Sequence, residues 1–226
     1  MNALLVTGAN RGLGLEFARS FAADGWRVHA CCRIPERAKD LAKVDGDVSV
    51  HRLDVTDGLR VASLARELAD EPIDVLINNA GVLHENNSLG GIDYDDWVDE
   101  LKVNTIAPVR MAERFLEQVA ASERKLIVNM TSGMASIADT ASSRSIVYRS
   151  SKAALNMATK CLALEYAGRG VTVVALSPGW VATDMGGPNA ELSPEESVAK
   201  MRRFLARVSP AESGGFFNPD GVARPW

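Results

Sequence analysis

Apolar and polar positions along this chain follow two alternating patterns. Short runs of apolar, mostly β-branched residues are each followed by a longer segment in which apolar residues recur every three or four positions. The first pattern is typical of strands buried on both faces, and the second of amphipathic helices. The predicted strands are 3–8, 26–32, 48–55, 73–81, 125–132 and 171–179. The predicted helices are 12–25, 35–44, 56–70, about 94–120 and 146–167.

This alternation predicts the α/β class: a doubly wound, mostly parallel sheet with helices on both faces. No internal repeat or linker divides the chain, so we expect residues 1–226 to form a single domain. Pro108 is expected to bend or interrupt the long helical stretch around it. Residues 183–210 contain glycine and proline followed by a short capped helix, and we expect them to form a lid over the substrate side.

Composition and charge exclude several classes of function. The formal net charge is −4, which gives no electrostatic case for binding nucleic acid. The sequence has no stretch near the ~20 apolar residues that a membrane span needs, and no basic leader at its start. The three cysteines and three scattered histidines have neither disulfide nor zinc-ligand spacing. We therefore expect a cytoplasmic protein that binds no metal and no membrane.

The first glycine turn carries the strongest local signal. TGANRGLG places Gly8, Gly12 and Gly14 after a predicted strand and at the start of a helix. Glycine allows the backbone to approach a pyrophosphate closely, and the helix N-terminus supplies free N–H groups and a positive dipole end. No Gly-Lys-Ser/Thr follows, so this is not a triphosphate-binding loop. A plain turn is the alternative, but the strand-turn-helix setting favours a dinucleotide.

The end of the second predicted strand indicates which dinucleotide is bound. A carboxylate about 20 residues beyond the glycines would favour NAD by binding the ribose 2′-hydroxyl. Here the strand ends in Arg33, no acid follows before Glu36, and Arg11 lies within the glycine turn. Guanidinium groups match a 2′-phosphate. The sequence therefore predicts NADP(H) in preference to NAD(H), the alternative being that Arg33 is a solvated loop residue.

Several short motifs together resemble the short-chain dehydrogenase/reductase family over nearly the whole chain. Each is weak alone, but they occur here in the family order. The motifs are TGANRGLG (7–14), LDV (53–55), NNAG (78–81), Asn104 in KVNTIAP, Ser132 in NMTSG, YRSSK (148–152) and SPGWVATDM (177–185). The sequence around these motifs, including GANRGLGLEFAR and the tail GGFFNPDGVARPW, is similar to the C-factor and Sniffer-like carbonyl reductase branch. The Ser132–Tyr148 spacing is longer than in many members, so loop 133–145 is expected to differ locally.

The resemblance implies a single Rossmann domain with a seven-stranded sheet and assigns roles to residues along it. It implies that Arg33 faces the 2′-phosphate and that the glycine turn borders the pyrophosphate and adenosine. The implied cofactor-binding residues are Gly8, Arg11, Gly12, Leu13, Arg33, Asp54, Val55, Asn78, Ala80, Gly81, Tyr148, Lys152, Pro178, Gly179, Val181 and Thr183. The implied catalytic residues are Asn104, Ser132, Tyr148 and Lys152.

Tyr148 and Lys152 lie four residues apart on a predicted helix, hence on one face. A nearby ammonium favours the phenolate, and lowering a tyrosine pKa to about 7 requires roughly 4 kcal/mol. We expect Lys152 to exert this effect, so that Tyr148 exchanges a proton with a carbonyl oxygen while Ser132 fixes that oxygen. Such a pair alone is more often a surface contact, and only the accompanying motifs favour catalysis.

The leading interpretation is an NADPH-dependent oxidoreductase that reduces an aldehyde or ketone to an alcohol. The alternative is a regulatory or signalling protein that uses the same fold to bind a cofactor, against which the retained serine, tyrosine and lysine count. An epimerase or dehydratase is disfavoured by the length and by the glycine spacing. The family commonly pairs its two long helices between subunits, so a homodimer or homotetramer is expected.

Overall fold

Seven strands form one parallel sheet in the computed structural model, which describes residues 1–84 and 89–226. The strands are β1 (Ala3–Thr7), β2 (Arg27–Cys32), β3 (Val48–Arg52), β4 (Val75–Asn78), β5 (Leu126–Met130), β6 (Thr172–Leu176) and β7 (Phe216–Phe217). Their order is β3-β2-β1-β4-β5-β6-β7, and every neighbouring pair is parallel. The strand order reverses between β1 and β4, where doubly wound sheets bind ligands at their carboxyl ends. The predicted fold class is confirmed.

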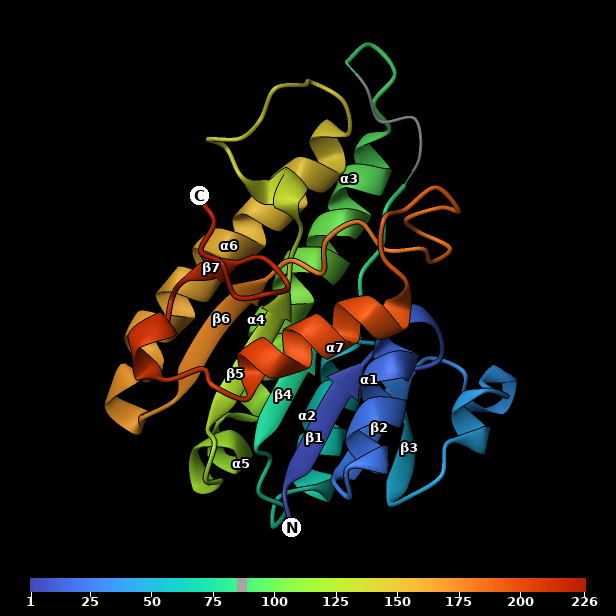
Figure 1. Ribbon diagram of the computed structural model, residues 1–226, viewed down its shortest axis with the longest axis vertical. Coiled ribbons are helices and arrows are strands. Elements are labelled where there is room, and N and C mark those ends of the chain that lie inside the picture. Colours follow the sequence, from blue (N-terminus) through green and yellow to red (C-terminus); the bar gives the residue numbers. More distant parts are fainter. Residues whose placement is uncertain (85–88) are drawn as a thin grey trace.

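Two helical layers cover the sheet. The helices are α1 (Gly12–Ala23), α2 (Gly58–Glu67), α3 (Tyr94–Leu101), α4 (Ala107–Arg114), α5 (Leu116–Ala121), α6 (Ile146–Tyr166) and α7 (Pro194–Leu205). Figure 1 shows α1 and α7 in front of the sheet and α2 and α4 behind it. Separate cores fill the two sides, with Phe17 and Phe204 in one and Leu64 and Phe115 in the other. Strands β1, β4, β5 and β6 are buried along their whole length, as their continuous apolar runs predict.

The predicted helix at 35–44 is wrong. The chain instead makes two short 3₁₀ turns, Pro35–Arg37 and Leu41–Lys43. Only Ala38 and Leu41 are buried in this segment, and their three-residue separation suits a 3₁₀ turn without requiring a longer amphipathic helix. Strand β7 was also not located from the sequence, because two residues are too few to show a period.

The long helical stretch predicted around 94–120 is broken where Pro108 removes a hydrogen bond. Because proline has no N–H, the carbonyl of Asn104 would lose its α-helical partner. A turn of π-helix spans Lys102–Ile106 at this place, between α3 and α4. Phe115 then separates α4 from α5 with a backbone conformation outside the helical region. The predicted interruption is confirmed, and its form is a π turn.

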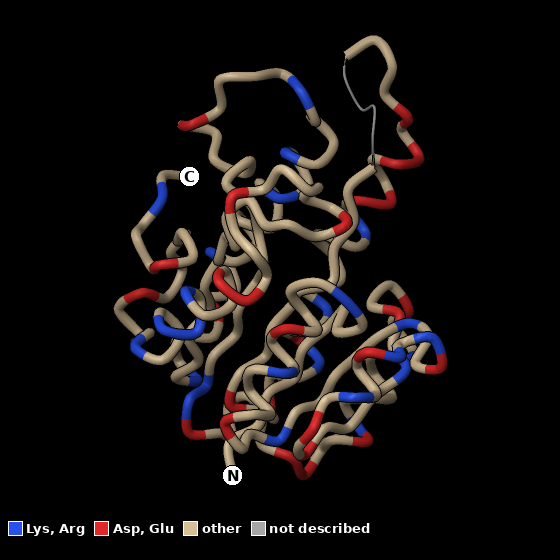
Figure 2. Tube along the Cα trace, turned by 45° about the vertical axis from the view of Figure 1, so that its right-hand side comes forward, with Lys and Arg blue, Asp and Glu red and all other residues tan. Residues whose placement is uncertain are grey.

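The segment predicted as a lid divides into two parts. Helix α7 begins with a capping box at Ser193 and buries Val198, Met201 and Phe204 in the core on the α1 side. It is therefore a layer of the fold, and the prediction of a lid is wrong for this part of 183–210. The loop before α7 instead reaches the carboxyl edge of the sheet. In the view of Figure 2, acidic and basic positions are interspersed along the chain.

Candidate active site

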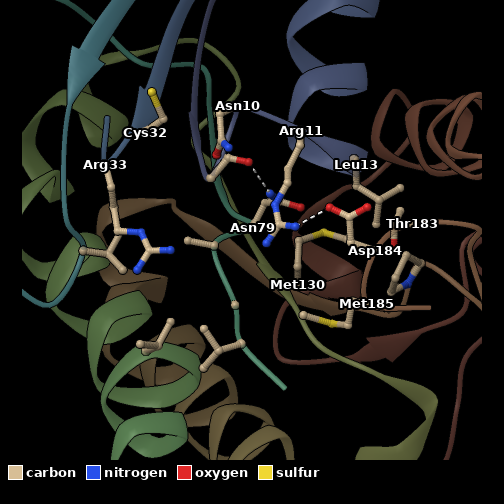
Figure 3. A pocket seen from close by; sticks show the side chains of 18 of the residues that line it. Asn10, Arg11, Leu13, Cys32, Arg33, Asn79, Met130, Thr183, Asp184 and Met185 are labelled. Carbon is tan, nitrogen blue, oxygen red and sulfur yellow. Dashed lines mark hydrogen bonds and ion pairs between the residues drawn. The ribbon is translucent and has the colours of Figure 1, made fainter. Parts of the chain in front are cut away.

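A cavity of about 960 Å³ opens at the carboxyl ends of the central strands. It is bounded by the glycine turn, the ends of β2, β4 and β5, helix α6 and the loop after β6. The predicted site residues that line it are Gly8, Arg11, Gly12, Leu13, Arg33, Asp54, Val55, Ala80, Gly81, Tyr148, Lys152, Pro178 and Thr183. Figure 3 shows Arg33 on one side of this pocket and Thr183, Asp184 and Met185 on the other. Residues distant in sequence are thus brought together as the motifs predict.

The glycine turn forms a cradle that side chains would fill. Gly8 and Gly12 adopt positive φ angles of 68° and 54°, which favour glycine. A Cβ on Gly14 would lie 2.3 Å from the carbonyl oxygen of Gly8. The turn leads into the N-terminus of α1, where N–H groups face the cavity end. These features fit the pyrophosphate of a dinucleotide.

The two adjacent asparagines after β4 have different positions. The side chain of Asn78 is buried and donates to Asn129 Oδ1 at 2.8 Å and to the carbonyl oxygen of Pro108 at 3.2 Å. It therefore braces β5 and α4 and does not line the cavity, although the resemblance implied that Asn78 binds the cofactor. Asn79 lines the cavity instead, and its Nδ2 donates to the carbonyl oxygen of Thr7 at 2.9 Å. The motif located the pair, but only the chain path shows which of the two faces the pocket.

At the β2 end of the cavity two exposed guanidinium groups remain available. Arg33 and Arg37 both line it, and neither forms an ion pair with any residue that the structure describes. Glu36, the nearest acid in sequence, pairs with Arg52. Arg11, expected to be the second guanidinium here, pairs instead with Asp184 of the loop after β6 (Figure 3). Arg37 is not among the predicted site residues, because it lies within the segment for which a helix was wrongly predicted.

Tyr148 and Lys152 lie on α6 with their side chains buried at the inner end of the cavity. Lys152 Nζ donates to the carbonyl oxygen of Met130 at 2.9 Å and lies 5.8 Å from the centre of the Tyr148 ring. Burial raises the pKa of Tyr148 to about 12 and lowers the pKa of Lys152 to about 8. The pKa of Tyr148 therefore rises in this structure and is not lowered as expected, because the loss of solvation outweighs the effects that favour the phenolate. Tyr148 is protonated at neutral pH.

Ser132 lies at the end of β5, half-buried beside the phenol. Its Oγ accepts from Met134 N at 3.1 Å, and a hydrogen bond between Ser132 and Tyr148 acts to lower the pKa of the phenol against the effect of burial. Ser132 does not line the cavity itself. The loop that follows is held by the C-terminus, since Ala138 N donates to the carbonyl oxygen of Trp226 at 2.9 Å. This long-range contact had no signal in the sequence.

Asn104 is fully buried in the π turn between α3 and α4. Its Oδ1 accepts from Val82 N at 2.9 Å, and its Nδ2 donates to Val82 O at 2.9 Å and to Ser151 Oγ at 3.0 Å. The side chain thus joins the loop after β4 to α6 from behind the cavity. Gly179 and Val181, two further residues predicted to bind the cofactor, do not line the cavity either. Gly179 has a positive φ of 82°, and Val181 forms a β-bridge with Leu192.

The cavity as a whole fits a nicotinamide dinucleotide, with the glycine cradle in its wall, Tyr148 and Lys152 at its inner end, and Ser132 beside the phenol. The residues that line it and that the sequence analysis did not single out include Asn10, Cys32, Val82, Val103, Met130 and Asp184. Within residues 1–84 and 89–226 no cluster of three histidine, cysteine or acidic side chains could hold a metal ion. None of the helices in the described residues is both long and apolar enough to cross a bilayer.

Comparison with known proteins identifies the family. A family model described as short chain dehydrogenase matches residues 2–193. The protein C-signal of Myxococcus xanthus is 38% identical over 164 residues, 73% of this chain and 99% of that protein. The structure of carbonyl reductase Sniffer of D. melanogaster has a TM-score of 0.94 and 31% identity, covering 100% of both chains. An NADPH-bound carbonyl reductase from chicken fatty liver has a TM-score of 0.93 and 34% identity, covering 100% of this chain and 99% of that one.

The resemblance noted from the motifs, including the carbonyl reductase and Sniffer-like branch, is thereby confirmed. The chain belongs to the short-chain dehydrogenase family and is an oxidoreductase of that family.

Proposed function

We propose that this protein is an NADPH-dependent carbonyl reductase that converts an aldehyde or ketone to an alcohol. The observation that carries the proposal is the buried, protonated phenol of Tyr148, which shares one cavity with the glycine cradle. A protonated phenol is the form that a reductase needs, because the substrate oxygen must gain a proton. Similarity to the two carbonyl reductase structures supports the same reaction.

The chain's own residues supply the proton and the electrostatic environment. When bound, the reduced cofactor supplies the hydride. The hydroxyl groups of Ser132 and Tyr148 hold the substrate oxygen, and Tyr148 Oη gives up its proton as negative charge develops there. The phenolate that remains is stabilised by the Ser132 hydroxyl and by the ammonium of Lys152. Asn104 keeps the backbone at Val82 in place behind this group.

The preference for NADPH over NADH rests on the two unpaired guanidinium groups of Arg33 and Arg37. A 2′-phosphate accepts several charge-assisted hydrogen bonds from such groups. Replacing both by serine should weaken NADPH binding at least tenfold and leave NADH binding within a factor of about two, since each charge-assisted bond contributes about 1.5–3 kcal/mol. Fluorescence titration with both cofactors measures this. Equal loss for both would contradict the assignment.

Val82, Val103 and Met185 contribute apolar surface to the wall of the cavity. We therefore propose an apolar or aromatic carbonyl compound as substrate. We also propose a homodimer or homotetramer, for which the exposed apolar side chains of Met157 and Leu164 on α6 offer contact surface. Sedimentation of the purified protein measures the assembly directly.

The deciding experiment measures NADPH consumption with a mixed panel of aldehydes, ketones and quinones, with Tyr148→Phe in parallel. Turnover by the parent protein and its loss in the variant would establish the reductase and its proton donor. No turnover with any compound, combined with tight NADPH binding, would favour a cofactor-binding regulatory protein. The similarity to C-signal is the observation that favours this second function.

A further inference from the structure

The segment around Arg224 folds back against the turn that follows Ser132. Arg224 N donates to Phe216 O at 2.8 Å beside β7, and the Trp226 ring stacks on the Phe216 ring with centroids 5.7 Å apart. The carbonyl oxygen of Trp226 accepts from Ala138 N at 2.9 Å, in the loop after β5. Figure 1 shows this end of the chain beside β7. The segment is therefore held from two sides, by β7 and by the loop after β5.

The guanidinium group of Arg224 lies directly on Gly133, the residue after Ser132. A Cβ on Gly133 would lie 2.9 Å from Arg224 Nη1 and 3.0 Å from its Cζ. The backbone of Gly133 lies outside the positive-φ region. A side chain at this position is therefore excluded by the guanidinium group and not by the backbone conformation.

Two partners hold the guanidinium group in this place. Arg224 Nη1 donates to Asn218 Oδ1 at 3.0 Å, and Nη2 pairs with Asp139 Oδ2 at 3.1 Å. The Nε atom of Arg224 is buried and has no hydrogen-bond partner within residues 1–84 and 89–226. Burying a donor in this way costs free energy that an apolar side chain of the same length would not lose. Packing alone therefore does not explain an arginine at this position.

A second contact holds Gly133 at the end of β6. Gly133 N donates to Ser177 Oγ at 3.0 Å, and Ser177 directly follows that strand. The Cα of Gly133 is covered by the guanidinium group and its N–H is bound, so the residue has little freedom to move. Ser132 Oγ accepts from Met134 N at 3.1 Å, across Gly133. The direction of the serine hydroxyl thus depends on the conformation of Gly133.

We propose that Arg224 is a positioning residue that acts through Gly133 and fixes the hydroxyl of Ser132 beside the phenol of Tyr148. This inference rests on the proposed reductase function, in which the Ser132 hydroxyl holds the substrate oxygen. Arg224 does not line the cavity, so its effect on turnover passes through Ser132. A displacement of about 1 Å caused by a change far from the reacting atoms can cost on the order of 10²-fold in rate.

The first measurement needs neither substrate nor cofactor. Arg224→Met keeps the length of the side chain and removes the guanidinium group. Amide hydrogen exchange is read residue by residue from ¹⁵N NMR and compared with the amides of strand β1. We expect at least ~10-fold faster exchange at Gly133 and Met134, whose N–H groups bind Ser177 Oγ and Ser132 Oγ.

Arg207→Met is the matched control. Arg207 Nη2 donates to Asp220 O at 2.9 Å, so this arginine holds the turn next to Asn218. Gly133 has the guanidinium group of Arg224, and not that of Arg207, beside it. Exchange at Gly133 should therefore be unchanged in Arg207→Met.

Turnover then connects Arg224 with Ser132. Arg224→Met should lower kcat at least ~10-fold and leave the Kd for NADPH within a factor of about two, because the guanidinium group does not line the cavity. In a Ser132→Ala background the same change should alter kcat less than about twofold, because the hydroxyl that Arg224 positions is already absent. A merely structural role would lower kcat by the same factor in both backgrounds. Arg207→Met should alter kcat in neither.

The outcomes separate this inference from the proposed function. Unchanged exchange at Gly133 and Met134 in Arg224→Met would overturn the positioning role even if the parent protein is an active reductase. An equal loss of kcat in both backgrounds would overturn it as well. A parent protein that reduces no compound would overturn the reductase, while faster exchange would still show that Arg224 fixes the turn after Ser132.

Gly133→Ala replaces Arg224→Met if the latter does not fold. Its Cβ displaces the guanidinium group and leaves Arg224 in the chain. The same loss of kcat and the same faster exchange at Met134 are expected. A Gly133→Ala protein with the kcat and the exchange rate of the parent would contradict the proposal.

Discussion

Replacing Lys152 by methionine tests how strongly burial opposes the charge of this side chain. Its pKa falls from the ordinary 10.5 to about 8, with burial as the main cause. Each pH unit of this shift corresponds to about 1.4 kcal/mol. Burying the charged lysine therefore lowers the free energy of unfolding by ~3 kcal/mol. Methionine has similar length, fits an apolar environment and carries no charge.

The direction of the pH dependence follows from the lowered pKa. Below pH 8 the lysine is charged in both states, and the full penalty is present. Between about pH 8 and 10.5 the unfolded chain binds a proton that the folded protein does not, so the stability of the parent rises with pH. Relative to Lys152→Met, the parent should therefore gain roughly 2–3 kcal/mol between pH 7 and pH 10.

Urea denaturation at the two pH values measures this gain. With a slope of about 2–3 kcal/mol per M, the difference in midpoints between variant and parent should change by about 1 M. The lost hydrogen bond to Met130 and any packing change are the same at both pH values and cancel. Lys160→Met, at an exposed position on the same helix, is the control and should show no such change. A difference that stays constant with pH would refute the reasoning.

Three further variants test other parts of the site. Tyr148→Phe should lower kcat by about 10²–10⁴-fold and change the free energy of unfolding by no more than about 1.5 kcal/mol, since the variant loses the proton donor and its hydrogen bond to Ser132; retained turnover would exclude this residue as the donor. Gly14→Ala should destabilise the protein by about 1–3 kcal/mol and weaken NADPH binding, because its Cβ would lie 2.3 Å from Gly8 O; unchanged affinity in a fluorescence titration would contradict the cradle. Asn104→Ala leaves the N–H and carbonyl of Val82 without partners and should cost at least ~2 kcal/mol in urea unfolding. A loss below ~0.5 kcal/mol would show that water replaces the amide there.

Much of the site could be predicted because its signals are local. Positive φ angles at Gly8 and Gly12 require glycine, so the sequence marks the cradle wherever it folds. The separation of Tyr148 and Lys152 by four residues places both on one face of any helix that contains them. Pro108 lacks an N–H in every structure, and the break at the π turn follows from that.

Other features depended on contacts that no local pattern records. The segment 35–44 has good helix formers, yet its two buried residues suited 3₁₀ turns, and Arg37 reached the cavity as a result. Asn78 and Asn79 are identical in type, and only the direction in which the chain leaves β4 decides which one faces the pocket. Glu100 on α3 carries no motif, yet it is fully buried, because α3 packs against α6.

The sequence by itself determined most of the order of strands and helices, the glycine cradle, and the residue types available for proton transfer. Tertiary structure alone decided the charge states in the site. The pKa of Tyr148 rises and that of Lys152 falls because strands, loops and helices distant in sequence together exclude water from both groups. Loss of solvation sums over everything that surrounds a group in space. Spacing along the chain can therefore place a phenol beside an ammonium, but it does not set the protonation of either.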